Sequence, residues 1–418
     1  MENELKKVFA VIDLKAFYAF VECIDRGLDP WKTSLVVADK TRGTNTIILS
    51  VTPYLKSLGI PSRLRIKELP KKYNYIYATP RMQRYIDKSA EIVSIMSEFV
   101  SYDDIHVYSI DEAFLDLSSY LKYYNMSPTE IVQMIIKEIN ERTGLQATAG
   151  IGDNMFLAKV ALDIFAKSAP NFIAVLKKEE VQERLWPITP LSKIWSIGPR
   201  TEAKLNKLGI FNVGELANSN RDYMKSKFGI IGEQLIDLAN GIDESDMHEE
   251  YIPKETSLSL GQVLFKDYNR DEVVTIIREM TDELATRLRS EGKHTSKVSL
   301  FIGYSLAEQG GFARQMSLLS PTDNTQKLFE AIMEIFNMFI QDKPIRRVSI
   351  NYGKLSNPNY EQLSMFEEPE KVIAEEKLQK AIDLINSKYG KNAILRGEAL
   401  TDKSTIRERH SFIGGHKK

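Results

Sequence analysis

The sequence predicts a mixed α/β (α+β) fold. Residues 8–13 (VFAVID) form a continuous apolar run that ends in Asp13, and such runs are typical of strands buried on both faces. Apolar side chains alternate over 113–117, which indicates a half-buried strand. Apolar residues repeat at helical spacing over 271–290, between two strand-like runs. Sheets and amphipathic helices are therefore expected in one chain.

Three carboxylates stand where the first strands end. Asp13 closes the first run, and Asp111 and Glu112 lie side by side at the bend that leads into the second strand. Carboxylates at the corner of an apolar hairpin are costly to desolvate unless a cation neutralises them. A lone Asp-Glu pair would be a solvated hairpin tip, but three carboxylates can hold two Mg²⁺ ions about 3.5–4 Å apart in a phosphoryl-transfer site.

Composition limits the classes of protein to which the chain can belong. Its 418 residues carry 27% charged side chains, yet the formal net charge is −1. A uniformly basic DNA-binding protein is thus excluded, and affinity for nucleic acid must come from local patches. Cys23 is the only cysteine, so no intramolecular disulfide is expected. Apolar segments stay shorter than roughly 18 residues, which predicts a cytoplasmic protein without signal peptide or membrane span.

Three motifs, IDLKAFYAFVE (12–22), YSIDEAFLDL (108–117) and AGIGDNMFLAKVA (149–161), resemble the palm motifs of Y-family DNA polymerases. The resemblance extends over about residues 8–366 and points to the bacterial UmuC-like and UvrX-like branch. It implies a right-hand polymerase with a ferredoxin-like palm, small fingers, a helical thumb and a little finger. The implied activity is error-prone, translesion DNA synthesis on damaged templates.

The resemblance also implies the division of the chain into domains. The palm is expected over 1–24 and 78–171, the fingers over 25–77, the thumb over 172–242, the little finger over 254–355, and a clamp-binding peptide with a tail over 356–418. In the fingers, the residues predict strands over 35–38 and 46–51 and a short helix over 54–59. In the palm they predict helices over 80–104 and 127–143, a strand over 147–152, and a helix capped by Asn154 that carries Lys159.

Site residues are carried over from the family one by one. The resemblance implies that two Mg²⁺ ions are bound by Asp13, the Leu14 carbonyl, Asp111 and Glu112, that Tyr18 is the steric gate against ribonucleotides, and that the nucleotide is also contacted by Phe17, Ser50, Lys56 and Lys159. Lys15 departs from the pattern, because many members of the family carry a further Asp there.

In the thumb, residues 192–210 predict two helices joined by a Gly-Pro turn, which resembles a helix-hairpin-helix that clamps DNA without sequence preference. Gly198 is expected to supply unusual backbone angles, and Arg200 and Lys204 to contact phosphate beside the amides of the second helix. The alternative is an ordinary helical hairpin.

Beyond an acidic linker at 242–253, the residues predict a β-α-β-β-α-β domain. Its strands are expected over 256–264, 295–304, 312–319 and 345–353, and its helices over 271–290 and 325–341.

Two features mark the tail. Gln362, Leu363, Ser364, Met365 and Phe366 resemble the peptide with which bacterial polymerases bind the β sliding clamp. An amphipathic helix is predicted over 371–390, and residues 396–418 are basic, which leaves open a flexible arm or a partner contact.

The expected partners are primer-template DNA, a deoxynucleoside triphosphate and the β sliding clamp, with accessory subunits or a recombinase filament as further candidates from UmuC-like enzymes. The expected location is the cytoplasm, at the nucleoid, with no membrane partner. Two alternatives remain open: a non-catalytic accessory protein that binds clamp and DNA, and a palm-fold nucleotide cyclase.

Overall fold

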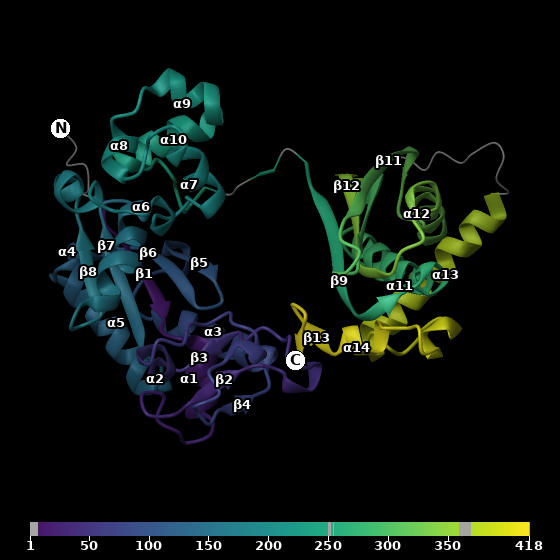
Figure 1. The fold of residues 1–418 in the computed structure, drawn as a ribbon, viewed down its shortest axis with the longest axis horizontal. Coiled ribbons are helices and arrows are strands. Elements are labelled where there is room, and N and C mark those ends of the chain that lie inside the picture. The colour runs from purple at the N-terminus through teal and green to yellow at the C-terminus, as the bar shows by residue number, and fades with distance from the viewer. Residues whose placement is uncertain (1–6, 250–251, 254, 359–368, 418) are drawn as a thin grey trace. The chain divides into compact units, whose positions relative to one another are not determined.

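The computed structural model describes residues 7–249, 252–253, 255–358 and 369–417. The fold is mixed α/β, as predicted, and the chain divides into two compact units, Met1–Glu250 with His416–Lys418 and Tyr251–Gly415. Figure 1 shows the elements of each unit. In the described residues, no helix is long and apolar enough to cross a membrane.

The first unit is built on a five-stranded sheet with the order β5-β6-β1-β7-β8. Its strands are β1 (Phe9–Leu14), β5 (Ile105–Ser109), β6 (Glu112–Asp116), β7 (Ala147–Gly152) and β8 (Ile173–Leu176). The central strand β1 pairs antiparallel with both β6 and β7 and is almost fully buried, so the predicted two-faced burial is confirmed.

Alternation along β1 decides which side chains meet which helices. Ala10, Ile12 and Leu14 pack into a core with α1 (Phe17–Ile24), α3 (Met82–Met96) and α5 (Pro128–Thr143). Phe9 and Val11 point to the other face, where α6 (Met155–Val160) supplies Met155 and Ala158. Because side chains alternate with period two, Asp13 lies on the α6 face of the sheet.

Two glycines let α6 pack directly on β7. A Cβ at Gly150 would lie 2.1 Å from the Ala158 carbonyl oxygen, and one at Gly152 would lie 2.4 Å from the Ala158 nitrogen. The Asn154 side chain caps the helix by accepting a hydrogen bond from the Leu157 N–H at 2.8 Å, as predicted. The helix continues through a π-helical turn, Ala161–Phe165.

A three-stranded sheet with the order β3-β2-β4 follows α1 in sequence. Its elements are β2 (Leu35–Val37), β3 (Ser50–Val51), α2 (Pro53–Ser57) and β4 (Ile76–Ala78). The strand predicted over 46–51 is wrong in its first half. There the Ile48 N–H donates to the Leu64 carbonyl and the Ile66 N–H to the Thr46 carbonyl, so this stretch pairs with a loop.

Of the two long helices predicted in this unit, one has the predicted bounds and the other is shorter. α5 matches its prediction, since Ser127 caps its start and Gly144 ends it in the left-handed conformation. The helix predicted over 80–104 is shorter: α3 ends at Met96, after which Val100 turns into the core. The short helix α4 (Tyr120–Tyr124) precedes α5.

Four further helices complete the first unit: α7 (Pro199–Asn206), α8 (Val213–Ala217), α9 (Arg221–Phe228) and α10 (Ile230–Ala239). The first helix predicted within 192–210 is only a 3₁₀ turn at Leu191–Lys193. The expectation for Gly198 is also wrong, because its φ of −86° is extended. Ser196 carries the left-handed φ of 75° instead.

The second unit confirms the predicted β-α-β-β-α-β order. It runs β9 (Ser257–Tyr268), α11 (Arg270–Ser290), β10 (His294–Tyr304), β11 (Gly311–Thr322), α12 (Thr325–Phe339) and β12 (Ile345–Ser356). The strands form an antiparallel sheet with the order β11-β10-β12-β9, and both helices share one core with it.

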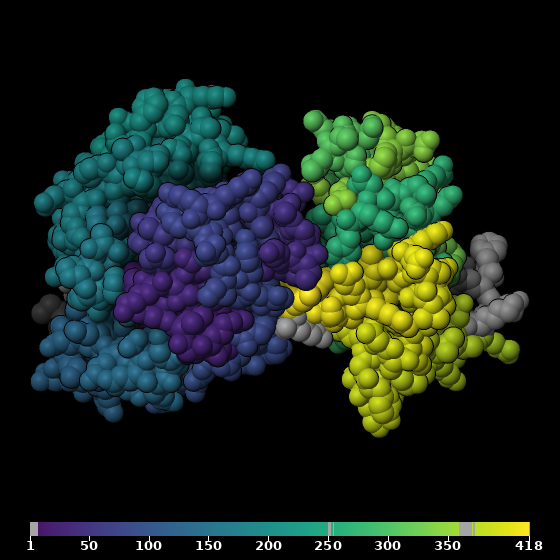
Figure 2. All heavy atoms as spheres, turned by 60° about the horizontal axis from the view of Figure 1, so that its bottom comes forward, coloured from purple at the N-terminus to yellow at the C-terminus, as the bar shows by residue number. Residues whose placement is uncertain are grey.

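The C-terminal segment contains α13 (Pro369–Tyr389), α14 (Ile406–His410) and the short strands β13 (Phe412–Ile413) and β14 (His416–Lys417). It is not a flexible arm, because Arg396 pairs with Asp282 of α11 at 2.6 Å and Arg409 with Glu283 at 2.8 Å. Figure 2 shows the yellow atoms of this segment, up to Gly415, against the green atoms of the second unit.

The helix predicted over 371–390 exists as α13, but its apolar side is not its buried side. Leu378 is 60% exposed, whereas Asp383 accepts hydrogen bonds from Arg289 and Thr286 of α11. The clamp-like residues 362–366 lie outside the described residues.

Candidate active site

Strand pairing brings the three predicted carboxylates to one end of the large sheet. Asp13 and Glu112 are direct cross-strand partners of β1 and β6. Asp111 precedes β6, where its carboxylate accepts a hydrogen bond from the Ser109 hydroxyl at 2.8 Å and its carbonyl accepts one from the Leu14 N–H at 2.9 Å. The hairpin bend and the end of β1 are thus joined by a backbone hydrogen bond.

The electrostatics of Asp13 mark this end of the sheet as a site for cations. Burial, together with the nearby charges of Asp111 and Glu112, raises the pKa of Asp13 to about 7. Lys159 and Lys167 oppose this rise without cancelling it. A buried cluster of like charges with too few counter-charges is stabilised by a divalent cation.

Lys159 of α6 reaches the same place from the facing helix. Its ammonium lies 2.8 Å from Glu112 Oε1 and 3.1 Å from Asp163 Oδ2, and Lys167 lies 3.1 Å from Asp163 Oδ1. Burial acts to lower the pKa of Lys159, but the hydrogen bond to Glu112 and the charges of Glu112 and Asp163 outweigh it and raise the pKa. The predicted phosphate contact is thus paired with a predicted metal ligand.

The donor chemistry fits a hard divalent metal. Carboxylate and carbonyl oxygens are the ligands that Mg²⁺ prefers, and Asp13, Leu14, Asp111 and Glu112 supply them at one sheet end. Across the described ranges, no three acidic, histidine or cysteine side chains already converge as a ligand set. Glu112 is paired with Lys159 of α6 instead.

Two predicted nucleotide contacts approach from the three-stranded sheet. Burial and the charge of Lys167 lower the pKa of Lys56, while Asp13 and Asp111 act in the opposite direction, so Lys56 lies within electrostatic reach of the carboxylates. Ser50 is buried, and its hydroxyl donates to the Ala16 carbonyl at 3.4 Å. Ser50 therefore supports the left-handed turn at Ala16, which has a φ of 48°.

Tyr18 and Phe17, at the start of α1, have different surroundings. The Tyr18 ring stacks on Tyr85, with centroids 4.4 Å apart and planes at 20°. Burial and the charge of Asp111 raise the pKa of the Tyr18 hydroxyl. Phe17 is only 2% exposed in the core, so a nucleotide contact through its ring would require the core to open.

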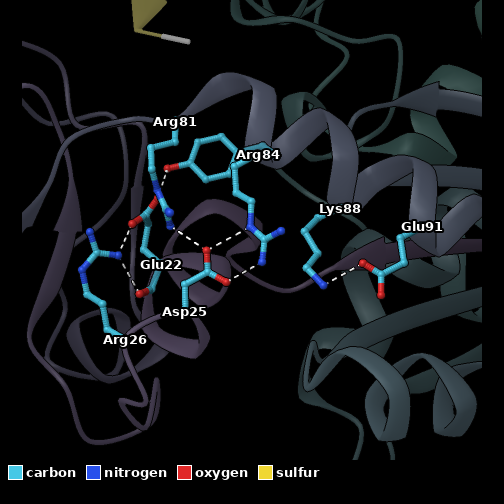
Figure 3. A network of polar contacts seen from close by, with 8 residues as sticks. Glu22, Asp25, Arg26, Arg81, Arg84, Lys88 and Glu91 are labelled. Carbon is cyan, nitrogen blue, oxygen red and sulfur yellow. Dashed lines mark hydrogen bonds and ion pairs between the residues drawn. The ribbon is translucent and has the colours of Figure 1, made fainter.

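Tyr85 is itself held by a buried carboxylate. Its hydroxyl donates to Glu22 Oε1 at 2.7 Å, and both side chains are fully buried. Figure 3 shows that Arg26 and Arg81 converge on Glu22, with Arg81 Nε at 2.9 Å from Oε1. Arg81 also pairs with Asp25 at 2.7 Å, so α1 is tied to the start of α3.

Sequence reasoning missed several residues of this site. Asp163 and Lys167 continue the row of Lys159 at spacings of four, a pattern that was visible in the sequence. Tyr85 gave no such signal, since only the fold brings α3 beside α1. The predicted DNA contacts are exposed in a separate part of the first unit, with Gly198 and Arg200 at the start of α7 and Lys204 in its last turn.

Comparisons with known proteins show which family the chain resembles. The chain matches the impB/mucB/samB family over residues 12–163, the C-terminal domain of that family over 255–365, and the IMS family HHH motif over 178–210. UvrX of Bacillus subtilis (strain 168), which is named for UV-damage repair, is 36% identical and covers 99% of this chain and 98% of its own. DNA polymerase IV 2 of the same organism is 34% identical, covering 99% of each chain.

A solved structure supports the fold. A Y-family DNA polymerase chimera superposes with a TM-score of 0.67 at 21% identity, covering 84% of this chain and 99% of the chimera. The family motifs and the full-length relatives lead to one assignment. The chain belongs to the impB/mucB/samB family of Y-family DNA polymerases.

Proposed function

We propose that the protein is a DNA-directed DNA polymerase of the error-prone translesion type, which adds deoxynucleotides to a primer 3′-hydroxyl opposite damaged template. The observation that carries this proposal is the cross-strand pair of Asp13 and Glu112, with Asp111 at the adjoining bend and Lys159 facing them from α6. Four charged groups at one sheet end suit phosphoryl transfer, in which positioning and charge neutralisation supply most of the catalysis.

In this proposal, Asp13, the Leu14 carbonyl, Asp111 and Glu112 would hold two Mg²⁺ ions. Metal held by these residues would supply a lower pKa for the primer hydroxyl and positive charge opposite the phosphates. The hydroxyl attacks the α-phosphorus of the nucleotide, and pyrophosphate leaves. Lys159 changes partners from Glu112 to the β- and γ-phosphates, and Lys56 supports the same phosphates.

Tyr18 selects the sugar in this mechanism. Its ring, stacked on Tyr85, occupies the place where a ribose 2′-hydroxyl would project, so a ribonucleotide meets a steric clash. Ser50 acts indirectly, by supporting the turn at Ala16 that precedes Tyr18.

We assign the domains as the sequence suggests, with the palm over 1–24 and 78–171, the fingers over 25–77, the thumb over 172–242 and the little finger over 254–355. Primer-template DNA is then held by the α7 region, through Gly198, Arg200 and Lys204, and by the sheet of the second unit. An enzyme with this substrate works in the cytoplasm at the nucleoid. Accessory subunits or a recombinase filament are candidate partners.

Primer extension tests the function. Wild-type protein with Mg²⁺ and all four dNTPs should extend a primer on an undamaged template, and on one with a blocking lesion, whereas an Asp111→Ala, Glu112→Ala double variant should not. Asp103→Ala is a matched control, because Asp103 lies in the turn before β5, away from the three carboxylates. Failure of the wild type to extend, with the β clamp also present, would instead support an accessory protein.

The clamp contact needs its own experiment. The β sliding clamp should bind the intact chain, and Leu363→Ala with Phe366→Ala should weaken that binding by at least about tenfold, or ~1.4 kcal/mol. Clamp-free primer extension should be unchanged in this variant. Equal clamp binding by variant and wild type would refute the assignment of residues 362–366.

A further inference from the structure

Lys15 follows the first carboxylate and is held by two aromatic rings. Its ammonium lies 3.9 Å from the centroid of Phe172 and 5.2 Å from that of Trp31. Both distances are within the range of a cation–π contact. Its backbone N–H donates to the Gln146 carbonyl at 2.8 Å, which fixes the residue at the end of β1.

The rings of Trp31 and Phe172, which we call the Trp31–Phe172 corner, are fixed in place by the fold. Phe172 has a φ of 57°, a left-handed conformation that is strained for a bulky side chain. Its carbonyl accepts the Ala149 N–H at 2.8 Å and its N–H donates to the Ala169 carbonyl at 3.0 Å, so the backbone is pinned on both sides. The Trp31 ring stacks on Phe172 at 6.5 Å and meets the edge of Phe20 at 6.0 Å.

The rings leave the ammonium without an anionic partner. Among the described residues, Lys15 makes no ion pair and its side chain makes no hydrogen bond, although an ammonium carries three donors. The ammonium is therefore available to an anionic ligand two residues beyond Asp13.

We propose that Lys15 is a phosphate-binding residue, whose ammonium is presented by the Trp31–Phe172 corner to the triphosphate of the incoming nucleotide. The inference rests on the proposed polymerase function. An ammonium that stands just beyond β1 without an ion pair in the described residues can bind a ligand with several negative charges, and a triphosphate is such a ligand. The competing explanation is that Lys15 only packs on the rings and stabilises the fold.

The test uses inorganic tripolyphosphate as the probe, with the intact chain in metal-free buffer. Calorimetry should show saturable binding, and emission from Trp31 should change with the same dissociation constant. Lys15→Gln should weaken binding by about tenfold, or ~1.4 kcal/mol, and Lys15→Arg should bind within about threefold of wild type. Lys32→Gln removes the same charge from an exposed position beside Trp31 and should change nothing.

Several controls separate the explanations. Trp31→Phe should remove the emission change and keep most of the calorimetric binding, which assigns the signal to this corner. Lys15→Met keeps the packing on the rings, so a variant that melts like wild type but binds tripolyphosphate weakly supports the proposal even if Lys15→Gln unfolds. Wild-type affinity in Lys15→Met, or no saturable binding by the wild type, would overturn it.

The polymerase assignment is tested separately, because the binding assay needs no turnover. In primer extension, Lys15→Gln should raise KM for dNTP by about the same factor as the dissociation constant and leave kcat nearly unchanged. If the protein extends primers but binds tripolyphosphate equally well without Lys15, only this inference is refuted. If tripolyphosphate binding depends on Lys15 but no primer is extended, only the polymerase assignment is refuted.

Discussion

Lys159 Nζ lies 2.8 Å from Glu112 Oε1, and each side chain is only 9% exposed. A candidate phosphate contact and a candidate metal ligand thus neutralise each other before any substrate arrives. Without this pair, burying the charged Glu112 carboxylate would cost free energy, since burial acts to raise the pKa of this carboxyl. The pair keeps both groups charged at the place where each is needed.

Replacing Lys159 with Met should therefore destabilise the protein and impair extension. The variant leaves Glu112 buried without a cation, which should lower the free energy of unfolding by about 3 kcal/mol. Mg²⁺ should restore part of this loss, because a metal held by Glu112 replaces the missing charge. Melting temperatures with and without Mg²⁺ measure both effects. Lys167→Met is the control, since within the described residues its more exposed side chain pairs with Asp163 alone; an equal loss there would contradict the special role of Lys159.

Substituting Tyr18 with Ala should open the site to ribonucleotides. The half-buried ring stacks on Tyr85 at the edge of the core, so its removal should leave space beside the sugar. The ratio of kcat/KM for rNTP over dNTP should rise by about 100-fold, or ~2.7 kcal/mol. Single-nucleotide insertion measures this ratio. Tyr18→Phe keeps the ring and should discriminate as wild type does; loss of discrimination in Tyr18→Phe would refute a steric gate.

The contact between Glu22 and Tyr85 should show the cost of an unpaired buried hydroxyl. Glu22→Leu removes the acceptor. Because Tyr85 is fully buried, its hydroxyl cannot hydrogen-bond to water instead, and the free energy of unfolding should fall by about 2–3 kcal/mol. The arginines that pair with Glu22 reach solvent and add little. Adding Tyr85→Phe should recover part of the loss, because both polar partners are then gone. Urea unfolding followed by fluorescence measures these differences.

Glu91→Gln is the matched control for that series. Glu91 pairs with Lys88 at the surface, as Figure 3 shows, and an exposed pair contributes little. Its loss should stay within about 0.5 kcal/mol. A loss as large as that of Glu22→Leu would mean that burial does not set the energy of this network.

The parts of the site that follow from local patterns were predictable. The buried run before Asp13 and the alternation after Glu112 each fix which way side chains point, and antiparallel pairing then makes these two residues neighbours. The partner of Lys159 was not predictable, since Glu112 is 47 residues away and the contact depends on the close approach of α6 to β7. Local spacing reports the face of an element and not what covers that face.

The C-terminal segment shows the same limit. Periodicity correctly predicts a helix at α13, yet the side that contacts α11 is the polar one, through Asp383. Arg396 and Asp282 are 114 residues apart in the chain, so no local sequence pattern predicts that they form a pair. Net basic character left a flexible arm and a partner contact both open, because the acidic side chains that pair with this segment lie on another element, α11.

Removing Arg409 should loosen the C-terminal segment from α11 in a pH-dependent way. Arg409 pairs with Glu283 at 2.8 Å and lies 3.9 Å from the buried Glu279. Burial raises the pKa of Glu279, against hydrogen bonds from Ser404 and Thr405 and the charge of Arg409. Arg409→Met should raise that pKa further and destabilise the second unit by about 2 kcal/mol near neutral pH.

The sign of the pH effect follows from linkage. A carboxyl whose folded pKa lies above its unfolded value contributes stability at low pH that is lost as the pH rises through the folded pKa. In Arg409→Met the folded pKa of Glu279 is higher still, so the variant loses more stability than wild type as the pH rises. The difference in melting temperature between variant and wild type should therefore be largest at alkaline pH and should shrink on acidification. Melting temperatures between pH 5 and 8 test this, with Arg407→Met as an exposed control of equal charge. A gap that widens on acidification would show that Glu279 is not the group that Arg409 stabilises.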